Sequence, residues 1–143
     1  MDHFALILFR FPDDAKVVVT DGLGQRTACT LGEAVSRHQI FRAHTGFDYA
    51  LRTRGCWDCL GLRVALVEFG VGPWTVRYDP PPIPARNCDW QFTHADFDAS
   101  YEGVENGWAG NGLSGAAASP DACLREIADI EEDRGLPRTL EAA

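Results

Sequence analysis

The chain has 143 residues, 45% of them hydrophobic, and a formal net charge of −8. This length suits one domain over residues 1–143, and the negative balance disfavours direct binding of nucleic acid or of an anionic membrane. No apolar run reaches the roughly 18 residues of a membrane-spanning helix, and no stretch resembles a signal peptide, so we expect a cytoplasmic protein.

The first part of the chain predicts strands and one capped helix. Phe4–Phe9 is continuously apolar, which is typical of a strand buried on both faces. Lys16–Thr20 is rich in β-branched residues, and Gln25–Cys29 follows a glycine-containing turn as its hairpin partner. Thr30-Leu-Gly-Glu33 has the spacing of a capping box, so we expect a helix over about 31–43.

The middle of the chain predicts three further strands and a loop. Phe47–Thr53 is expected as a short strand, and Gly55–Cys59 as the loop that follows it. Leu62–Phe69 and Trp74–Tyr78 alternate apolar and polar residues, the first only in part. We therefore expect these two segments to form an antiparallel hairpin.

A proline-rich segment at 79–84 cannot supply a ladder of hydrogen bonds and predicts an extended connector. It would join two sub-units, 1–79 and 85–143, within the one domain. Residues 1–88 carry 10 Lys/Arg and 9 Asp/Glu, whereas residues 89–143 carry 3 and 12. The net charge is therefore +1 in the first part and −9 in the second, and an acidic half attracts basic protein surfaces.

The acidic part predicts a hairpin and a second helix. Asp89–Asp98 is expected as a strand, and the glycine-rich stretch Trp108–Leu113 as its return. A helix is expected over 120–134, because Ser119 is a favoured N-cap, a proline follows it, and Gly135 suits the C-terminus. The fold class is thus α+β, a mainly antiparallel sheet with two helices in two ββα-like units at about 16–43 and 89–134.

An alternative interpretation of the function is a metal site, which four residues suggest. Cys56-Trp-Asp-Cys59 is a C-x-x-C pair, and Cys88 with His94 would complete a zinc site. A thioredoxin-like redox pair is disfavoured, because such a pair begins a helix, whereas Leu60-Gly61 and then a strand are expected to follow this one. This alternative is a zinc-binding module or a metal-dependent enzyme, whereas the main interpretation below needs no cofactor.

His94, Asp96 and Asp98 alternate along the expected strand and would place an imidazole and two carboxylates on one face. Such a row could bind a divalent ion or act in acid–base chemistry. Successive residues on one face of a strand are roughly 6.5–7 Å apart. One small ion could not bind all three without a bulge or a further ligand, and the alternative is an exposed strand end with solvated charges.

Three motifs resemble a module of small phage and prophage proteins. They are Trp90-x-Phe92-x-His94-x-Asp96-Phe-Asp98, Gly110-x-Gly112-x-Ser114, and Ser119-Pro-Asp-x-Cys123-x-x-x-Ile127-x-x-Ile130. Those proteins often read W-x-F-x-H-x-D-Y-D-G, followed by an acidic loop, a glycine-rich strand and a helix. Here Phe97 stands for the tyrosine and Ala99 for the glycine. The resemblance is confined to the second part of the chain, and it implies an origin in a mobile element rather than an activity.

We therefore interpret the chain as a phage-encoded acidic inhibitor of a host defence complex, similar in kind to anti-CRISPR or anti-restriction proteins. Its carboxylates would imitate phosphates and cover a basic nucleic-acid-binding surface on a protein or ribonucleoprotein in the host cytoplasm. Tyr101 and Trp108 would be apolar anchors, since interface energy concentrates in aromatic residues. No catalytic residue is expected. The carboxylates assigned to the partner-binding face are Asp96, Asp98, Glu102, Glu105, Asp129, Glu132 and Asp133.

Overall fold

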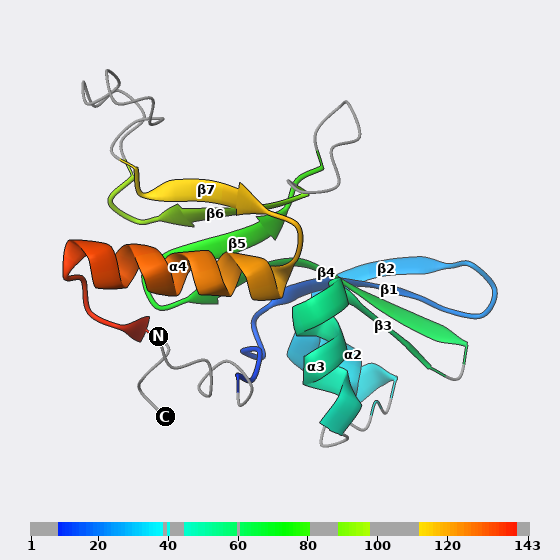
Figure 1. The fold of residues 1–143 in the computed structure, drawn as a ribbon. Helices are drawn as coiled ribbons and strands as arrows, with labels where there is room; N and C mark the ends of the chain where they lie inside the picture. The colour runs from blue at the N-terminus through cyan, green and yellow to red at the C-terminus, as the bar shows by residue number, and fades with distance from the viewer. Residues whose placement is uncertain are drawn as a thin grey trace.

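One antiparallel sheet and three helices make up the described part of this computed structural model (Figure 1). The described residues are 9–38, 40, 45–59, 61–80, 89–97 and 112–139. The expected strand at Phe4–Phe9 and the expected connector at 79–84 lie mostly outside these ranges. The α+β class with a mainly antiparallel sheet is confirmed, but a third helix was not expected.

The strands pair antiparallel in the order β2-β1-β4-β5-β6-β7, and β3 pairs with the first half of β4. The sheet is therefore continuous from the first part of the chain to the acidic part, through the pairing of β5 with β6. The strands are β1 (Lys16–Thr20), β2 (Arg26–Thr30), β3 (Cys56–Cys59), β4 (Leu62–Val71), β5 (Trp74–Tyr78), β6 (Trp90–His94) and β7 (Ser114–Ala117).

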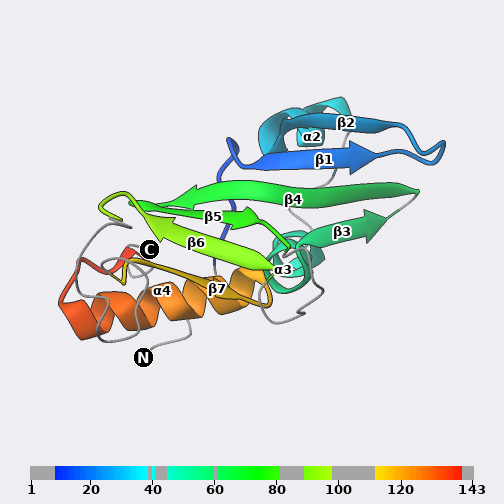
Figure 2. The same ribbon diagram turned by 90° about the horizontal axis from the view of Figure 1, so that it is seen from above.

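The strand β4 is the longest of these and contains a bulge. Its pairing with β1 skips Val67, which is left without an aligned residue on that strand. Leu66 faces the core before the bulge and Phe69 faces it afterwards, so the alternation of β4 changes at this point. One strand thereby serves both halves of the sheet, β1 and β3 on one side of the bulge and β5 on the other (Figure 2).

The three helices are α2 (Leu31–Arg37), α3 (Thr45–Arg54) and α4 (Pro120–Arg134). α2 contacts the β1–β2 hairpin, α3 contacts β3 and α4, and α4 contacts β6 and β7 (Figures 1 and 2). Between the helices and the sheet lies one apolar core. Its largest fully buried side chains are aromatic: Trp74, Phe11, Phe47, Phe69 and Phe92.

The expected capping box of α2 is confirmed, but the helix is shorter than expected. The Thr30 hydroxyl accepts from the Glu33 amide at 3.2 Å, and the Glu33 carboxylate accepts from the Thr30 amide at 3.4 Å. The Thr30 hydroxyl and then the Thr30 amide, as hydrogen-bond donors, hold the pKa of Glu33 below its usual value. The helix ends at Arg37 rather than near 43, because His38 has left helical geometry, with φ −103° and ψ 7°.

The expectation of a strand at Phe47–Thr53 is wrong, because this segment lies in α3. The apolar residues Phe47, Tyr49 and Leu51 recur with a period of two, as in a strand. However, Phe47 and Leu51 are both fully buried, whereas Tyr49 is 60% exposed. Burial at a spacing of four residues is the pattern of one helix face.

The expectation of a loop at Gly55–Cys59 is also wrong, since Cys56–Cys59 forms β3. This segment lacks the alternation and the β-branched residues that favour a strand. It is a strand because β4 offers a partner: Cys56 is aligned with Ala65, and Cys59 with Leu62. A long-range pairing of this kind leaves little signal in four residues of sequence.

The C-terminal helix agrees with the prediction from the sequence, whereas the hairpin before it differs from the prediction. In α4, the Ser119 hydroxyl accepts from the Ala122 amide at 3.1 Å, and Gly135 ends the helix with φ 64°. β6 ends at His94, four residues earlier than expected. β7 begins at Ser114, after the expected return strand at 108–113, most of which lies outside the described residues.

Cys123 lies on the buried face of α4, in the core between this helix and the sheet. Burial, with the nearby Glu126 carboxylate as the second cause, raises the pKa of its thiol to about 12. Because the thiolate is the reactive form, we expect iodoacetamide to modify Cys123 only after unfolding, and the half-buried Cys56 in the native protein. Peptide mass spectrometry over a labelling time course measures both rates, and equal rates would contradict the expectation.

Candidate functional site

α4 carries exposed carboxylates on the side that faces away from the sheet. Its buried residues Cys123, Leu124 and Ile127 recur at helical spacing, so the residues between them point to solvent. None of these carboxylates forms an ion pair with another residue in the described part of the chain. The exposed acidic residues are Glu126, Asp129, Glu132 and Asp133.

The strand β6 runs toward the end of the molecule where the last turn of α4 lies (Figure 1). The imidazole of His94, which ends β6, meets the Trp74 ring edge-on, with the centroids 4.8 Å apart. The Trp74 indole in turn donates to Glu131 of α4 at 3.1 Å. The side chain of Asp96, two residues beyond His94, is 83% exposed. Trp74 and Glu131 thus connect the end of β6, two residues before Asp96, to the last turns of α4.

The remaining residues of the expected partner-binding face lie outside the described part of the chain: Asp98, Tyr101, Glu102, Glu105 and Trp108. The candidate site that the structure describes therefore consists of Asp96 and the exposed carboxylates in the last turns of α4. We call Asp129, Glu132 and Asp133 the acidic end of α4. All three were assigned to the site from sequence because they fall between the apolar positions of this helix.

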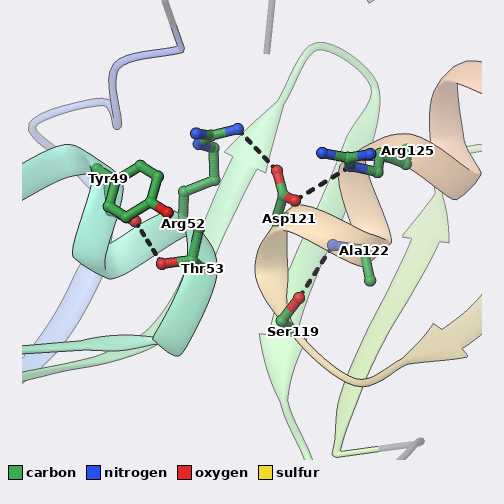
Figure 3. A network of polar contacts seen from close by, with 7 residues as sticks. All are labelled: Tyr49, Arg52, Thr53, Ser119, Asp121, Ala122 and Arg125. Carbon is green, nitrogen blue, oxygen red and sulfur yellow. Dashed lines mark hydrogen bonds and ion pairs between the residues drawn. The ribbon is translucent and has the colours of Figure 1, made fainter. Parts of the chain in front are cut away.

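The first turn of α4 has a different electrostatic environment, in which the carboxylate is neutralised (Figure 3). Asp121 binds Arg52 of α3, with 2.8 Å between Oδ1 and Nη1, and Arg125, with 3.1 Å between Oδ2 and Nε. Arg52 is 5% exposed and lies 5.5 Å from the centre of the Tyr49 ring. Asp121 therefore joins two helices and adds nothing to the acidic end of α4.

Glu131 is a buried carboxylate that sequence reasoning missed. It is 2% exposed and uses both oxygens as acceptors. Oε2 accepts from the Trp74 indole at 3.1 Å and from the Thr139 hydroxyl at 2.5 Å, and Oε1 accepts from the Thr139 amide at 3.2 Å. The sequence feature that could have indicated its burial is its position, since Glu131 continues the buried stripe of α4 one helical turn after Ile127. A buried carboxylate needs such partners, because desolvation without them is costly.

The expected row of His94, Asp96 and Asp98 on one strand face is wrong. β6 ends at His94, Ala95 and Asp96 form a turn, and Asp98 lies outside the described residues. His94 is also 9% exposed, so the alternative of an exposed, solvated strand end is wrong for this residue. Its Nδ1 accepts from the Asp96 amide at 2.9 Å, which leaves the proton of the neutral ring on Nε2.

The structure separates two of the four residues expected to bind zinc. Cys56 is aligned with Ala65 on β4, whereas His94 is aligned with Trp74, itself aligned with Val71 of β4. These two positions of β4 are six residue steps apart, which spans about 20 Å at strand geometry. Zinc ligands lie roughly 2.0–2.3 Å from the metal. The prediction of one zinc site that uses both Cys56 and His94 is therefore wrong.

The other two expected zinc ligands are beyond what the structure describes, namely Cys88 and the side chain of Cys59. The sulfur of Cys56 accepts a weak hydrogen bond from Arg63 Nη2 at 3.4 Å. In the described ranges, no group of three or more His, Cys, Asp or Glu residues is placed to hold a metal ion.

No protein-family model, no curated protein and no solved structure matches this chain. Among the residues that the structure describes, no helix combines the length and the apolar character needed to cross a bilayer.

Proposed function

We propose that the chain is an acidic inhibitor that covers a basic nucleic-acid-binding surface on a host defence complex. The observation that supports this most directly is the acidic end of α4, where Asp129, Glu132 and Asp133 project to solvent. Residues one helical turn apart lie roughly 5–6 Å from each other, so this end offers a short row of negative charges. A basic surface evolved to hold phosphates attracts such a row, and the attraction also raises the association rate.

The anchoring of α4 supports the proposal further, because a rigid row of charges loses little entropy on binding. Asp121 and Arg52 hold the first turn of the helix against α3. Glu131 and Trp74 hold the last turns against the sheet. Asp129 lies between these two anchors, and Glu132 and Asp133 directly follow the second, so the three charges are presented in one fixed arrangement.

The resemblance of the second part of the chain to phage and prophage proteins supports a host defence complex as the partner. An inhibitor of this kind acts in the host cytoplasm, binds protein or ribonucleoprotein, and needs neither a catalytic residue nor a cofactor. Asp96, with Asp98, Glu102 and Glu105, would extend the row of charges. Tyr101 and Trp108 would supply its apolar anchors.

Capture from a lysate of the host, followed by mass spectrometry, tests this proposal. We expect a nuclease or another nucleic-acid-binding complex, released by high salt and by competing double-stranded DNA. The charge-reversed variant Asp129→Lys/Glu132→Lys should bind the captured complex at least about tenfold more weakly, which corresponds to about 1.4 kcal/mol.

The matched control is Asp14→Lys/Asp58→Lys, which changes the net charge equally at exposed positions away from α4. This control should retain binding, and a loss common to both variants would mean that only net charge matters. Capture of no such complex, or equal binding by the α4 variant and the unmodified chain, would count against the proposal. Stoichiometric zinc in the purified protein would instead favour the zinc-binding alternative through Cys56, Cys59 and Cys88.

A further inference from the structure

Residues 136–139, which we call the strap, follow α4 and return toward the β4–β5 turn. The turn at Gly135 begins this path, and the Leu136 amide donates to the Glu131 carbonyl at 2.9 Å. Thr139 then reaches Gly72 in the β4–β5 turn. A Cβ placed on Gly72 would lie 2.5 Å from Thr139 Cγ2, so the strap meets this turn in close contact.

Thr139, the last residue of the strap, is held by polar contacts to one buried side chain. Glu131 accepts from both the amide and the hydroxyl of Thr139. The apolar contact of the strap with the core comes from Leu136, which is half-buried, whereas Pro137 and Arg138 are exposed and Thr139 is half-buried. The apolar contribution to its closure is correspondingly small, since that contribution scales with buried area.

We propose that Glu131 is a latch, and that the strap opens and closes on it as a local unit while the sheet and α4 stay folded. Opening admits water to the Glu131 carboxylate, and hydration replaces the hydrogen bonds that Thr139 donates. A segment with few buried apolar contacts opens at a lower free energy than the core unfolds. The latch also involves Trp74, because its indole N–H shares Oε2 of Glu131 with the Thr139 hydroxyl.

Opening changes the surface beside the acidic end of α4. Glu131 precedes Glu132 in the chain, and the open strap uncovers its carboxylate together with the Trp74 indole N–H. The latch therefore sets how many carboxylates this end of the molecule presents to solvent. The inference itself stands on the contacts of Glu131 and is independent of the proposed function.

Hydrogen exchange of the full chain, followed by NMR, tests the latch. We expect the Thr139 amide and the Trp74 indole N–H to exchange with similar opening free energies. Both should exchange at least about tenfold faster, relative to their intrinsic rates, than the backbone amide of Val76, which lies fully buried in β5. Exchange of the Thr139 amide together with Val76 would overturn the inference, because the strap would then open only when the whole protein unfolds. An unprotected Thr139 amide would overturn it as well.

Two variants distinguish a latch from general stabilisation. Glu131→Gln removes the charge and is expected to speed exchange of the Thr139 amide at least about tenfold relative to Val76. Thr139→Val keeps the shape, removes one donor and should act in the same direction at the Trp74 indole N–H. Glu132→Gln, at the adjacent exposed position, is the matched control and should change neither rate. Should Glu131→Gln fail to fold, exchange in Thr139→Val and in the unmodified chain still tests the latch. Unchanged exchange in Thr139→Val overturns the inference.

Discussion

Asp121→Ala is expected to lower the free energy of unfolding by about 3–5 kcal/mol, the range for removing one partner of a buried ion pair. The residue that carries this cost is Arg52, a guanidinium cation that is 5% exposed. Its guanidinium contacts the Asp121 carboxylate and the face of the Tyr49 ring. Without Asp121, this buried cation has no carboxylate partner among the residues that the structure describes.

The order of the related variants separates this explanation from a simple loss of contacts. Arg52→Met should cost less than Asp121→Ala, because Asp121 keeps its bond to Arg125 and is itself partly exposed. The double variant Arg52→Met/Asp121→Ala should be more stable than Asp121→Ala alone, since no unpaired charge is then buried. Arg125→Met, whose side chain is 48% exposed, should cost less than about 1 kcal/mol. Urea denaturation measures all four, and additive effects of Arg52→Met and Asp121→Ala would refute this reasoning.

Gly55→Ala is expected to lower the free energy of unfolding by about 2–5 kcal/mol, from two independent causes. Gly55 has a φ of 78°, which costs an L-residue about 1–2 kcal/mol. A Cβ at this position would also overlap Cζ2 of Trp90, a side chain that is only 5% exposed. Overpacking of this kind typically adds about 1–3 kcal/mol.

Gly24→Ala provides the control that separates the two causes. Gly24 has a φ of 84°, but a Cβ there would meet no atom of the described residues within 4 Å. This variant should therefore show only the conformational cost, and the difference from Gly55→Ala measures the overlap with Trp90. Trp90→Leu should recover part of the loss in Gly55→Ala. Equal denaturation midpoints for Gly24→Ala and Gly55→Ala would show that Trp90 does not resist the added atom.

The elements that the sequence predicted well are those whose signals lie within a few residues. α4 was predicted with its bounds, because Ser119, Pro120 and Gly135 specify its ends locally. The N-terminus of α2 followed from Thr30 and Glu33 in the same way. The β4–β5 hairpin followed from the alternation of its two strands, although the bulge in β4 was not foreseen.

The elements that were missed depend on distant partners. In α3, the apolar positions fit both a strand and a helix, and only packing under Phe47 and Leu51 decides between them. β3 exists because β4 pairs with it. No property of Cys56–Cys59 alone indicates that pairing.

The candidate site shows the same division. Asp129, Glu132 and Asp133 were placed correctly on the exposed side of α4, because helical periodicity separates them from Cys123 and Ile127. The two charged residues that matter most for packing were assigned no role. Arg52 and Glu131 are buried against partners that lie 69 and 57 residues away in the sequence, so the neighbouring residues do not identify these partners.

The bulge in β4 has a consequence for changes in chain length. Residues on the two sides of Val67 face the core with opposite parity in the numbering, as Leu66 and Phe69 illustrate. Deleting Val67 would restore a regular alternation and keep both sides facing inward. Deleting a residue in the middle of either flanking segment would instead turn the neighbouring apolar side chains toward water. Homologous chains that differ from this one by a single residue within β4 are thus expected to carry the gap at the bulge.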